Sequence, residues 1–277
     1  MKLLRILWLI CLLPRAVCAG EASSFTFAVV PQFTVAEIRR DWQPLLQRLQ
    51  EMTGVEFRLQ VSRSIPEFEQ DFQRGIPDFA FLNPYHAVMA SRSHGYIPLL
   101  RDSKPLTGIL VVRSDDPLKS VRQLDGRDLA FPAPNAFGAS LYLRALLAEE
   151  FRIRVTPRYV KTHSNVYRHV ILGEAAAGGA VNNTLEHESA EVRGRLRVLY
   201  ETPGVAAHPV VAHPRVPETV RKAFSEAIFR LAADSAMAPM LAAVQLPRPV
   251  AAHYARDYQV LEKLNLGRYV VSNEARP

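Results

Sequence analysis

Cysteine is almost absent from this chain. Only two of its 277 residues are cysteines, Cys11 and Cys18, and both lie within the first twenty positions. If that segment is removed, the remaining chain has no thiol, which excludes disulfide bonds, thiolate metal sites and a cysteine nucleophile. The 258 residues that follow residue 19 can bury one or two cores large enough to fold without such links.

Long hydrophobic runs are also missing. Residues 6–13 are apolar, but a membrane-spanning helix needs about 20 such residues. Lys2 and Arg5 precede this run and small residues follow it at 17–19, which is the order of a secretory signal peptide over residues 1–19. A buried first helix or a membrane anchor is the alternative. Arg15 replaces the leucine of a lipobox, so we expect a freely soluble periplasmic protein rather than a lipoprotein.

No block of like charge occurs. The formal charge of +7 falls by three, to +4, when the basic residues of the first nineteen positions are removed. The remaining arginines are scattered among acidic residues, as in residues 37–41, whereas nucleic-acid binders cluster basic residues with interleaved aromatics. The pattern argues against a nucleic-acid partner. It is compatible with a small anionic ligand, or with an ordinary solvated surface.

Signatures of common catalytic centres are lacking. The chain has no Gly-x-Ser-x-Gly elbow, no phosphate-binding Gly-rich loop ending in Lys-Ser or Lys-Thr, and no His-Glu-x-x-His. His208 with His213, or His163 with His169, could form a metal pair, but neither spacing is a ligand motif and no carboxylate clusters with them. We therefore expect that the protein binds no metal and no cofactor and that it is not an enzyme.

The chain does contain a regular alternation of strands and helices. The pairs Thr34–Glu37 and Ser64–Glu67 predict capping boxes, and Asn83 before Pro84 predicts a third helix start. This alternation predicts an α/β fold with mainly parallel sheets covered on both faces. The expected strands are residues 25–30, 56–61, 79–82, 96–100, 108–113, 129–131, 155–160, 176–181 and 196–200.

The alternation restarts in mid-chain, which predicts two lobes joined by two crossings, near residues 107–115 and 203–213. Parallel sheets bind ligands at the carboxyl ends of their strands, where loops lead into helices. We therefore expect a monomer with a ligand cleft between its lobes. The expected bounds are 20–112 with 207–277 for the first lobe and 113–206 for the second.

Polar and aromatic side chains follow the strands at the loops that would face this cleft. Helix starts there favour an anion, by roughly 0.3–2 kcal/mol each. Singly, the asparagines are better explained as helix caps, whereas Tyr85 is equally well explained as a core aromatic and His163 as a surface histidine. Their equivalent positions in a repeated pattern favour ligand binding. The candidate residues are Gln32, Phe33, Tyr85, Asn135, Ala136, Phe137, Gly138, His163 and Asn182.

Several short stretches occur in a distinctive order and spacing. They are residues 44–46 with Gly54, 78–85, 111–114, 124–126 with 129–131, His163, 172–173 and 209–211. Together they resemble the periplasmic solute-binding proteins of phosphate, phosphite and phosphonate ABC transporters, over nearly the whole chain after residue 19. The resemblance implies the type II binding-protein fold, in which two α/β lobes joined by two crossing strands close on a ligand by hinge motion.

The resemblance also implies residue roles. Tyr85 matches a cleft tyrosine of the family and His163 a histidine near the bound anion. Residues 135–138 match a Ser-Thr-Ser-Gly segment that cradles phosphonate oxygens, but here read Asn-Ala-Phe-Gly, and Ala176 replaces a usual aspartate. Hydrogen bonds of this kind are worth on the order of 1–3 kcal/mol each. Their loss favours a less polar or larger anion than a phosphonate.

The leading hypothesis is an exported binding protein that captures a small oxyanionic ligand and delivers it to an ABC permease in the inner membrane. A periplasmic partner that reports ligand to a membrane histidine kinase is an alternative. An enzyme on the same scaffold, with His163 as general base, is a further one.

Overall fold

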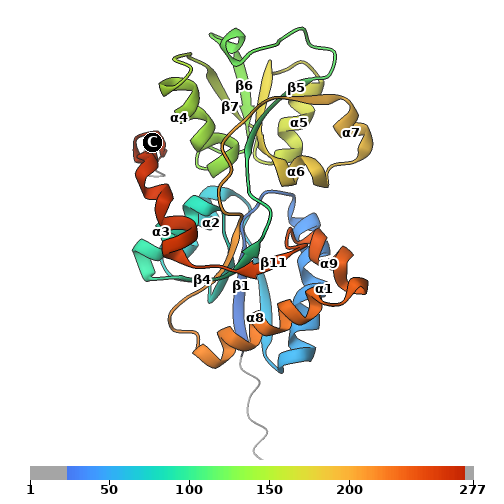
Figure 1. Ribbon diagram of the computed structural model, residues 1–277, viewed down its shortest axis with the longest axis vertical. Coiled ribbons are helices and arrows are strands. Elements are labelled where there is room, and N and C mark those ends of the chain that lie inside the picture. The colour runs from blue at the N-terminus through green and yellow to red at the C-terminus, as the bar shows by residue number, and fades with distance from the viewer. Residues whose placement is uncertain (1–23, 272–277) are drawn as a thin grey trace, which may run out of the picture.

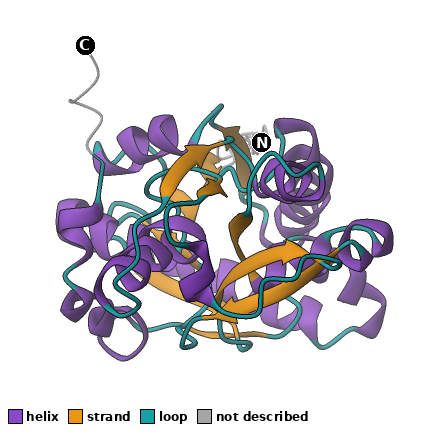
Figure 2. Ribbon diagram, turned by 90° about the horizontal axis from the view of Figure 1, so that it is seen from above, coloured by secondary structure: helices purple, strands orange, loops and turns teal. Residues whose placement is uncertain are grey.

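The computed structural model describes residues 24–271, and the expected signal peptide lies outside this range. Two sheets form two lobes, one above the other in Figure 1, and the chain passes between them twice. Figure 2 shows helices on both sides of the strands. Within the described residues, no helix combines the length and apolar character needed to cross a membrane. The two-lobed α/β architecture confirms the predicted fold class.

Lobe 1 is built on a six-stranded sheet of order β11-β4-β10-β3-β1-β2. Strands β2, β1 and β3 run parallel, whereas β10, β4 and β11 pair antiparallel. The strands are β1 (Ser24–Val29), β2 (Glu56–Val61), β3 (Phe79–Phe81), β4 (Ile97–Asp102), β10 (Pro209–Ala212) and β11 (Pro249–Ala251).

Lobe 2 is built on a five-stranded sheet of order β7-β6-β8-β5-β9. Its strands β7, β6 and β8 are parallel, and β5 pairs antiparallel with both β8 and β9. The strands are β5 (Gly108–Arg113), β6 (Asp128–Phe131), β7 (Thr156–Tyr159), β8 (Ala177–Val181) and β9 (Leu196–Glu201).

These pairings differ from the sequence-based expectation in two respects. Both sheets are mixed rather than mainly parallel, because strands that enter from the crossings pair antiparallel with their neighbours. The expected lobe boundary at residue 112/113 falls inside β5, which belongs entirely to the second sheet. The first crossing is therefore residues 103–107, between β4 and β5, and the second lies between β9 and β10.

Helices follow most strands, and their starts show local capping. Thr34 and Glu37 form the predicted capping box of α1. Ser64 accepts from the Glu67 N–H, but the Glu67 carboxylate accepts from the Arg63 N–H instead of completing a box. The lobe 1 helices are α1 (Val35–Thr53), α2 (Ile65–Gln73), α3 (Pro84–His94), α8 (Glu218–Ala232) and α9 (Ala238–Ala243), with the 3-10 turn η3 (Ser235–Met237) before α9.

Lobe 2 has shorter helices. They are η1 (Val121–Leu124), η2 (Phe137–Leu141), α4 (Tyr142–Glu149), α5 (His163–Ile171), α6 (Asn182–His187) and α7 (Ala190–Gly194). The π-helical turn η2 runs directly into α4, and it packs closely on the sheet because β8 carries glycine there: a Cβ on Gly179 would lie 2.1 Å from the Ala139 carbonyl oxygen. The π-helical turn is thereby held against the sheet of lobe 2.

The main hydrophobic core extends across both lobes. It is centred on aromatic residues of lobe 1, where Phe27, Phe79 and Phe224 stack within about 6.3 Å of one another. The same cluster includes Phe137 and Val181 of lobe 2. Lobe 2 has separate, smaller cores of its own. The lobes are thus in direct apolar contact along the facing ends of their sheets.

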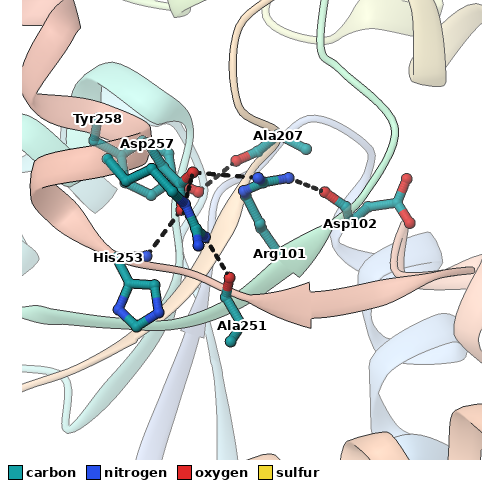
Figure 3. Close-up of polar contacts among 8 residues, drawn as sticks. Arg101, Asp102, Ala207, Ala251, His253, Asp257 and Tyr258 are labelled. Atoms are coloured by element: carbon teal, nitrogen blue, oxygen red, sulfur yellow. Dashed lines mark hydrogen bonds and ion pairs between the residues drawn. The ribbon is translucent and has the colours of Figure 1, made fainter.

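A C-terminal segment of turns, η4 (Tyr254–Tyr258), η5 (Gln259–Leu264) and η6 (Leu266–Tyr269), packs against the base of the crossings. In Figure 3 Asp257 pairs with Arg101 at 3.2 Å, and the Tyr258 hydroxyl donates to the Ala207 carbonyl at 2.8 Å. Burial acts to raise the pKa of Asp257, but hydrogen bonds from Arg256, the His253 N–H and Arg101 lower it overall. The Tyr258 contact ties the second crossing to the C-terminal segment, and the Asp257 contact ties that segment to β4 of lobe 1.

Candidate functional site

Loops from both lobes meet around one small cavity, which we call the cradle. Its volume is about 10 Å³, the room needed by about one water molecule. The loop after β1, the start of α3, the loop into η2, the start of α5, the end of β8 and the second crossing all contribute to it. The lining residues are Val30, Gln32, Ile65, Asn83, Ala136, Phe137, Gly138, Ala139, His163, Val181 and His208.

Five of the nine candidate residues line the cradle. They are Gln32, Ala136, Phe137, Gly138 and His163. Asn83, the predicted cap, also lines it while its side chain accepts from the His86 N–H at 2.7 Å. These loops meet at one place because the carboxyl ends of parallel strands share one edge of a sheet.

The aromatic candidates lie beside the cradle rather than in it. Phe33 is buried and contacts the ring of His187 on lobe 2, with ring centroids 4.8 Å apart. Tyr85 is half-buried and stacks on Phe137 at 6.4 Å. Both contacts cross between the lobes, so these rings support the closed arrangement of the two lobes.

The interpretation of Asn135 as a helix cap was wrong. The residue at the N-cap of η2 is Ala136, with no side-chain hydrogen bond. The Asn135 side chain instead donates to the buried Glu69 carboxylate at 3.1 Å and exchanges two bonds of 3.0 Å with the Val271 backbone. Glu69 also bonds the Nε2 atom of His86 at 2.9 Å. Asn135 therefore joins lobe 2 to α2 and to the C-terminal segment.

Asn182 does not line the cradle. Its Oδ1 accepts from the N–H groups of Thr107 and Asn183, and its Nδ2 donates to the Pro105 carbonyl at 3.0 Å. These bonds tie the end of β8 to the first crossing. The polar atoms of Asn182 are therefore already used within the protein, and its contact with open space is in a second cavity, on the side of α6.

His163 is held by a buried hydrogen-bond network. Thr184 Oγ1 donates its proton to the Val181 carbonyl at 2.9 Å and lies 3.1 Å from His163 Nδ1 and 2.8 Å from the Tyr167 hydroxyl. Since a hydroxyl has only one proton, Thr184 must accept from both neighbours. The His163 proton then resides on Nδ1, which leaves Nε2 as an acceptor for a ligand in the cradle.

Both histidines of the cradle are neutral near pH 7. Burial lowers the pKa of His163 to about 3. Burial, with the nearby His163 and His86 rings, also lowers the pKa of His208 to about 3. No lysine or arginine lines the cradle. The site therefore offers hydrogen bonds but no formal positive charge, and a histidine of such low pKa is a weak general base.

The start of η2 forms part of the wall of the cradle. Phe137, Gly138 and Ala139 line this cavity, and the first N–H groups of a helix have no partner within it. Gly138 allows the close approach of β8, because a Cβ there would lie 2.9 Å from Val181 Cγ1.

Sequence reasoning missed four residues at or beside the cradle: Glu69, Asn183, His208 and Gln245. Glu69 lies inside a helix, where a buried carboxylate has no local sequence signal. His208 ends a crossing segment and was considered only as a member of a metal pair. Within residues 24–271, no three His, Asp or Glu side chains gather as a metal site.

Comparison with known proteins agrees with this geometry. The family of phosphonate ABC transporter periplasmic substrate-binding proteins matches residues 27–262. No curated protein sequence gives a significant match.

Among solved structures, a binding protein component of a phosphonate transporter from Pseudomonas aeruginosa is similar with a TM-score of 0.77 and 14% identity, over 90% of this chain and 88% of its own. PhnD1 from Prochlorococcus marinus, solved with methylphosphonate, has a TM-score of 0.78 and 14% identity, over 87% and 97%. XAC2383 from Xanthomonas citri, solved with ATP, has a TM-score of 0.69 and 17% identity, over 90% and 98%. The chain therefore belongs to the family of phosphonate ABC transporter periplasmic substrate-binding proteins.

Proposed function

We propose that this protein binds a small oxyanion in the cradle and delivers it to an ABC permease of the inner membrane. The observation that supports this is the convergence of Gln32 from lobe 1 with His163 and the first residues of η2 from lobe 2 on one small cavity. In a chain of this family, that position is the natural place for the ligand. We further propose that the protein is exported by residues 1–19 and acts as a monomer in the periplasm.

The chemistry of the cradle favours an oxyanion of low charge. The N–H groups of Phe137 and Gly138 would donate to its unprotonated oxygens, and the free Nε2 of His163 would accept from a protonated one. Without a cation in the lining, a doubly charged group would be poorly compensated in this buried site. A singly charged, protonated phosphonate or phosphate satisfies both donor and acceptor.

Binding requires the lobes to separate. A cavity with room for about one water molecule cannot receive an oxyanion without movement. The crossings at residues 103–107 and 202–208 are the covalent links between the sheets. A hinge motion about them would open the cradle, and closure on the ligand would restore the contacts described above.

Calorimetric titration and thermal unfolding with inorganic phosphate, methylphosphonate and methanesulfonate test the proposal. We expect methylphosphonate to bind more tightly at about pH 6 than at about pH 8, because the second proton of a phosphate-type group is lost near pH 6 or above. Methanesulfonate has no proton to donate to His163 and should bind more weakly. A ligand at ~100 times its Kd adds about 2.7 kcal/mol of stability.

Two variants test the location. Replacement of His163 by alanine should weaken methylphosphonate binding at least about tenfold, equivalent to about 1.4 kcal/mol. Gly138→Ala should weaken it as well, by placing a Cβ against Val181. His169→Ala is the control, since His169 lies on the exposed part of α5 and pairs only with Glu174. Absence of binding by every anion would refute the proposed function.

A further inference from the structure

One wall of the cradle is a loop of lobe 2 that is held by contacts outside that lobe. We call residues 134–138 the cradle loop; three of them, Ala136, Phe137 and Gly138, line the cradle. The loop follows β6 and leads into η2, so chain connectivity alone would make it move with lobe 2. Its hydrogen bonds, however, also reach the C-terminal segment, which packs on lobe 1. The position of this wall therefore depends on both lobes.

Arg144 of α4 links the cradle loop to the C-terminal segment. Its Nη2 atom donates to the Pro134 carbonyl and to the Tyr269 carbonyl, each at 2.8 Å. Its Nε atom donates to the Ser140 hydroxyl oxygen at 3.2 Å. Ser140 is fully buried in η2, and its N–H donates to the Ala136 carbonyl at 2.8 Å. One guanidinium thus holds the chain on both sides of the residues that line the cradle.

Arg144 has no acidic partner within residues 24–271. Its three hydrogen bonds all go to neutral oxygens. The side chain is half-buried, and burial lowers the pKa of its guanidinium, although an arginine stays protonated at neutral pH. Burial of a charge without an opposite charge is costly. What arginine supplies here is a rigid fork of donors that fixes several oxygens at once.

Asn135 holds the same loop independently of Arg144. Its side chain exchanges two hydrogen bonds of 3.0 Å with the Val271 backbone and donates to Glu69 of α2 at 3.1 Å. Asn135 and Glu69 are both buried, so water competes little for these bonds. Neither Asn135 nor Arg144 lines the cradle. Two chemically different side chains therefore join one loop to one segment without reaching the cavity themselves.

The C-terminal segment is anchored on lobe 1. Leu261 and Leu266 are buried in the main core, and Glu262 pairs with Arg92 of α3 at 2.7 Å. Figure 1 shows this stretch of chain beside α3, reaching toward α4. Through it, lobe 1 can hold the cradle loop in place before a ligand arrives. A loop that is already in its bound position costs less ordering on binding, which raises affinity.

We propose that Arg144 and Asn135 are positioning residues for ligand binding. They hold the cradle loop on the C-terminal segment, so that lobe 1 sets the position of the lobe 2 wall of the cradle. The C-terminal segment is then a part of the binding machinery, although it contributes no residue to the cradle. This inference rests on the proposed function, because it concerns the same site.

Calorimetric titration of the full chain with methylphosphonate tests this inference. Arg144→Ala and Asn135→Ala each remove three hydrogen bonds, and Asn135→Ala does so without a change of charge. We expect each variant to bind at least about tenfold more weakly, mainly through faster release. Arg268→Ala is the matched control, since it removes an exposed ion pair between the C-terminal segment and α4 but no bond to the cradle loop. It should bind like the unmodified protein.

The double variant gives a result that a general loss of stability would not give. Because both side chains hold one loop, the second replacement should cost little once the first is made, and the double variant should bind less than about tenfold more weakly than either single variant. Independent effects would multiply instead. Thermal unfolding of each variant establishes that it is folded. If Arg144→Ala does not fold, Arg144→Gln, which keeps a donor, takes its place.

The outcomes separate the two proposals. If the unmodified protein binds methylphosphonate and Asn135→Ala binds it equally well, or if the two single effects multiply, the cradle loop is not positioned in this way and the proposed function stands. Weaker binding in Arg144→Ala alone would likewise overturn the inference, since the charge would then be what matters. If no anion binds to the unmodified protein, the proposed function fails and this inference fails with it.

Discussion

The two sides of the interlobe contact are built differently. On the side of α3 and α4, the C-terminal segment spans the gap: Arg268 pairs with Glu149, and Arg144 donates to the Tyr269 carbonyl at 2.8 Å. Asn135 adds its bonds to Glu69 and Val271. Lobe 1 thus sends a continuous stretch of chain, red at the left of Figure 1, onto lobe 2.

On the side of α6 and α9, side chains make most of the contacts, and one backbone hydrogen bond crosses between the lobes, from the His163 N–H to the Gln32 carbonyl at 3.2 Å. Phe33 contacts His187, and Asn183 reaches lobe 1 through Gln245. The second cavity, beside α6, separates the remaining surfaces. Because this side has fewer and more exposed contacts, we expect the lobes to part here first, with the C-terminal segment holding the opposite side. Ligand would then enter beside α6.

Acid should destabilise the folded protein, including both sides of the interlobe contact. This is the largest effect that we expect. The pKa values of His163 and His208 are lowered from 6.5 to about 3 in the folded protein. The unfolded chain therefore binds more protons below pH 6.5, so stability is present above that pH and is lost as the pH falls toward 3. Between about pH 7 and pH 5 the loss is up to about 2 kcal/mol for each histidine.

Urea unfolding at the two pH values measures this loss. His208→Gln should reduce it by up to half, whereas His169→Ala, at an exposed position, should not change it. Equal losses in His208→Gln and the unmodified protein would contradict a buried, neutral His208. This pH window lies above the ordinary carboxyl pKa values, so acidic residues contribute little.

The next largest effect should come from removal of Glu69, which weakens the side of α3 and α4. Glu69→Ala leaves His86 Nε2 and the Asn135 amide without their buried acceptor. At about 1–3 kcal/mol for each unpaired group, we expect a loss of about 3 kcal/mol in the free energy of unfolding, measured in urea. Glu67→Ala, on the exposed part of the same helix, is the control. A loss below 1 kcal/mol in the free energy of unfolding would show that the hydrogen bond between Glu69 and Asn135 is not a link between the lobes.

The smallest effect should come from the side of α6. His187→Ala removes the contact with Phe33, and aromatic pairs are worth about 0.5–1.5 kcal/mol. Because this side has few other links, we expect the His187→Ala variant to have a larger radius of gyration by small-angle X-ray scattering. Its free energy of unfolding should fall by only about 1 kcal/mol. Arg268→Ala removes an exposed ion pair with Glu149 on the side of α3 and α4. This variant should leave the radius of gyration unchanged. The reverse result would show that the lobes open at the C-terminal segment.

Local signals explain what was predicted about the site. The loops at residues 32–33, 83–85 and 135–138 were found because each follows a strand and precedes a helix. The Asn83 cap depends on residues three positions apart and was confirmed. The cap expected from Asn135 was wrong, because the N–H of Val271, 136 residues away, donates to the amide oxygen that a cap would use.

The sequence by itself determined the two alternating α/β units, the helix starts and the loops that border the cleft, since these depend on neighbours within one or two turns of chain. The tertiary structure alone decided which polar atoms remain free for a ligand. Gln32 and Gln245 are 213 positions apart and yet share a hydrogen bond. The side chain of Asn182 forms hydrogen bonds with the backbone of the first crossing, 75 to 77 residues earlier. Partnerships at such separations depend on how the lobes and crossings pack, which no local pattern encodes.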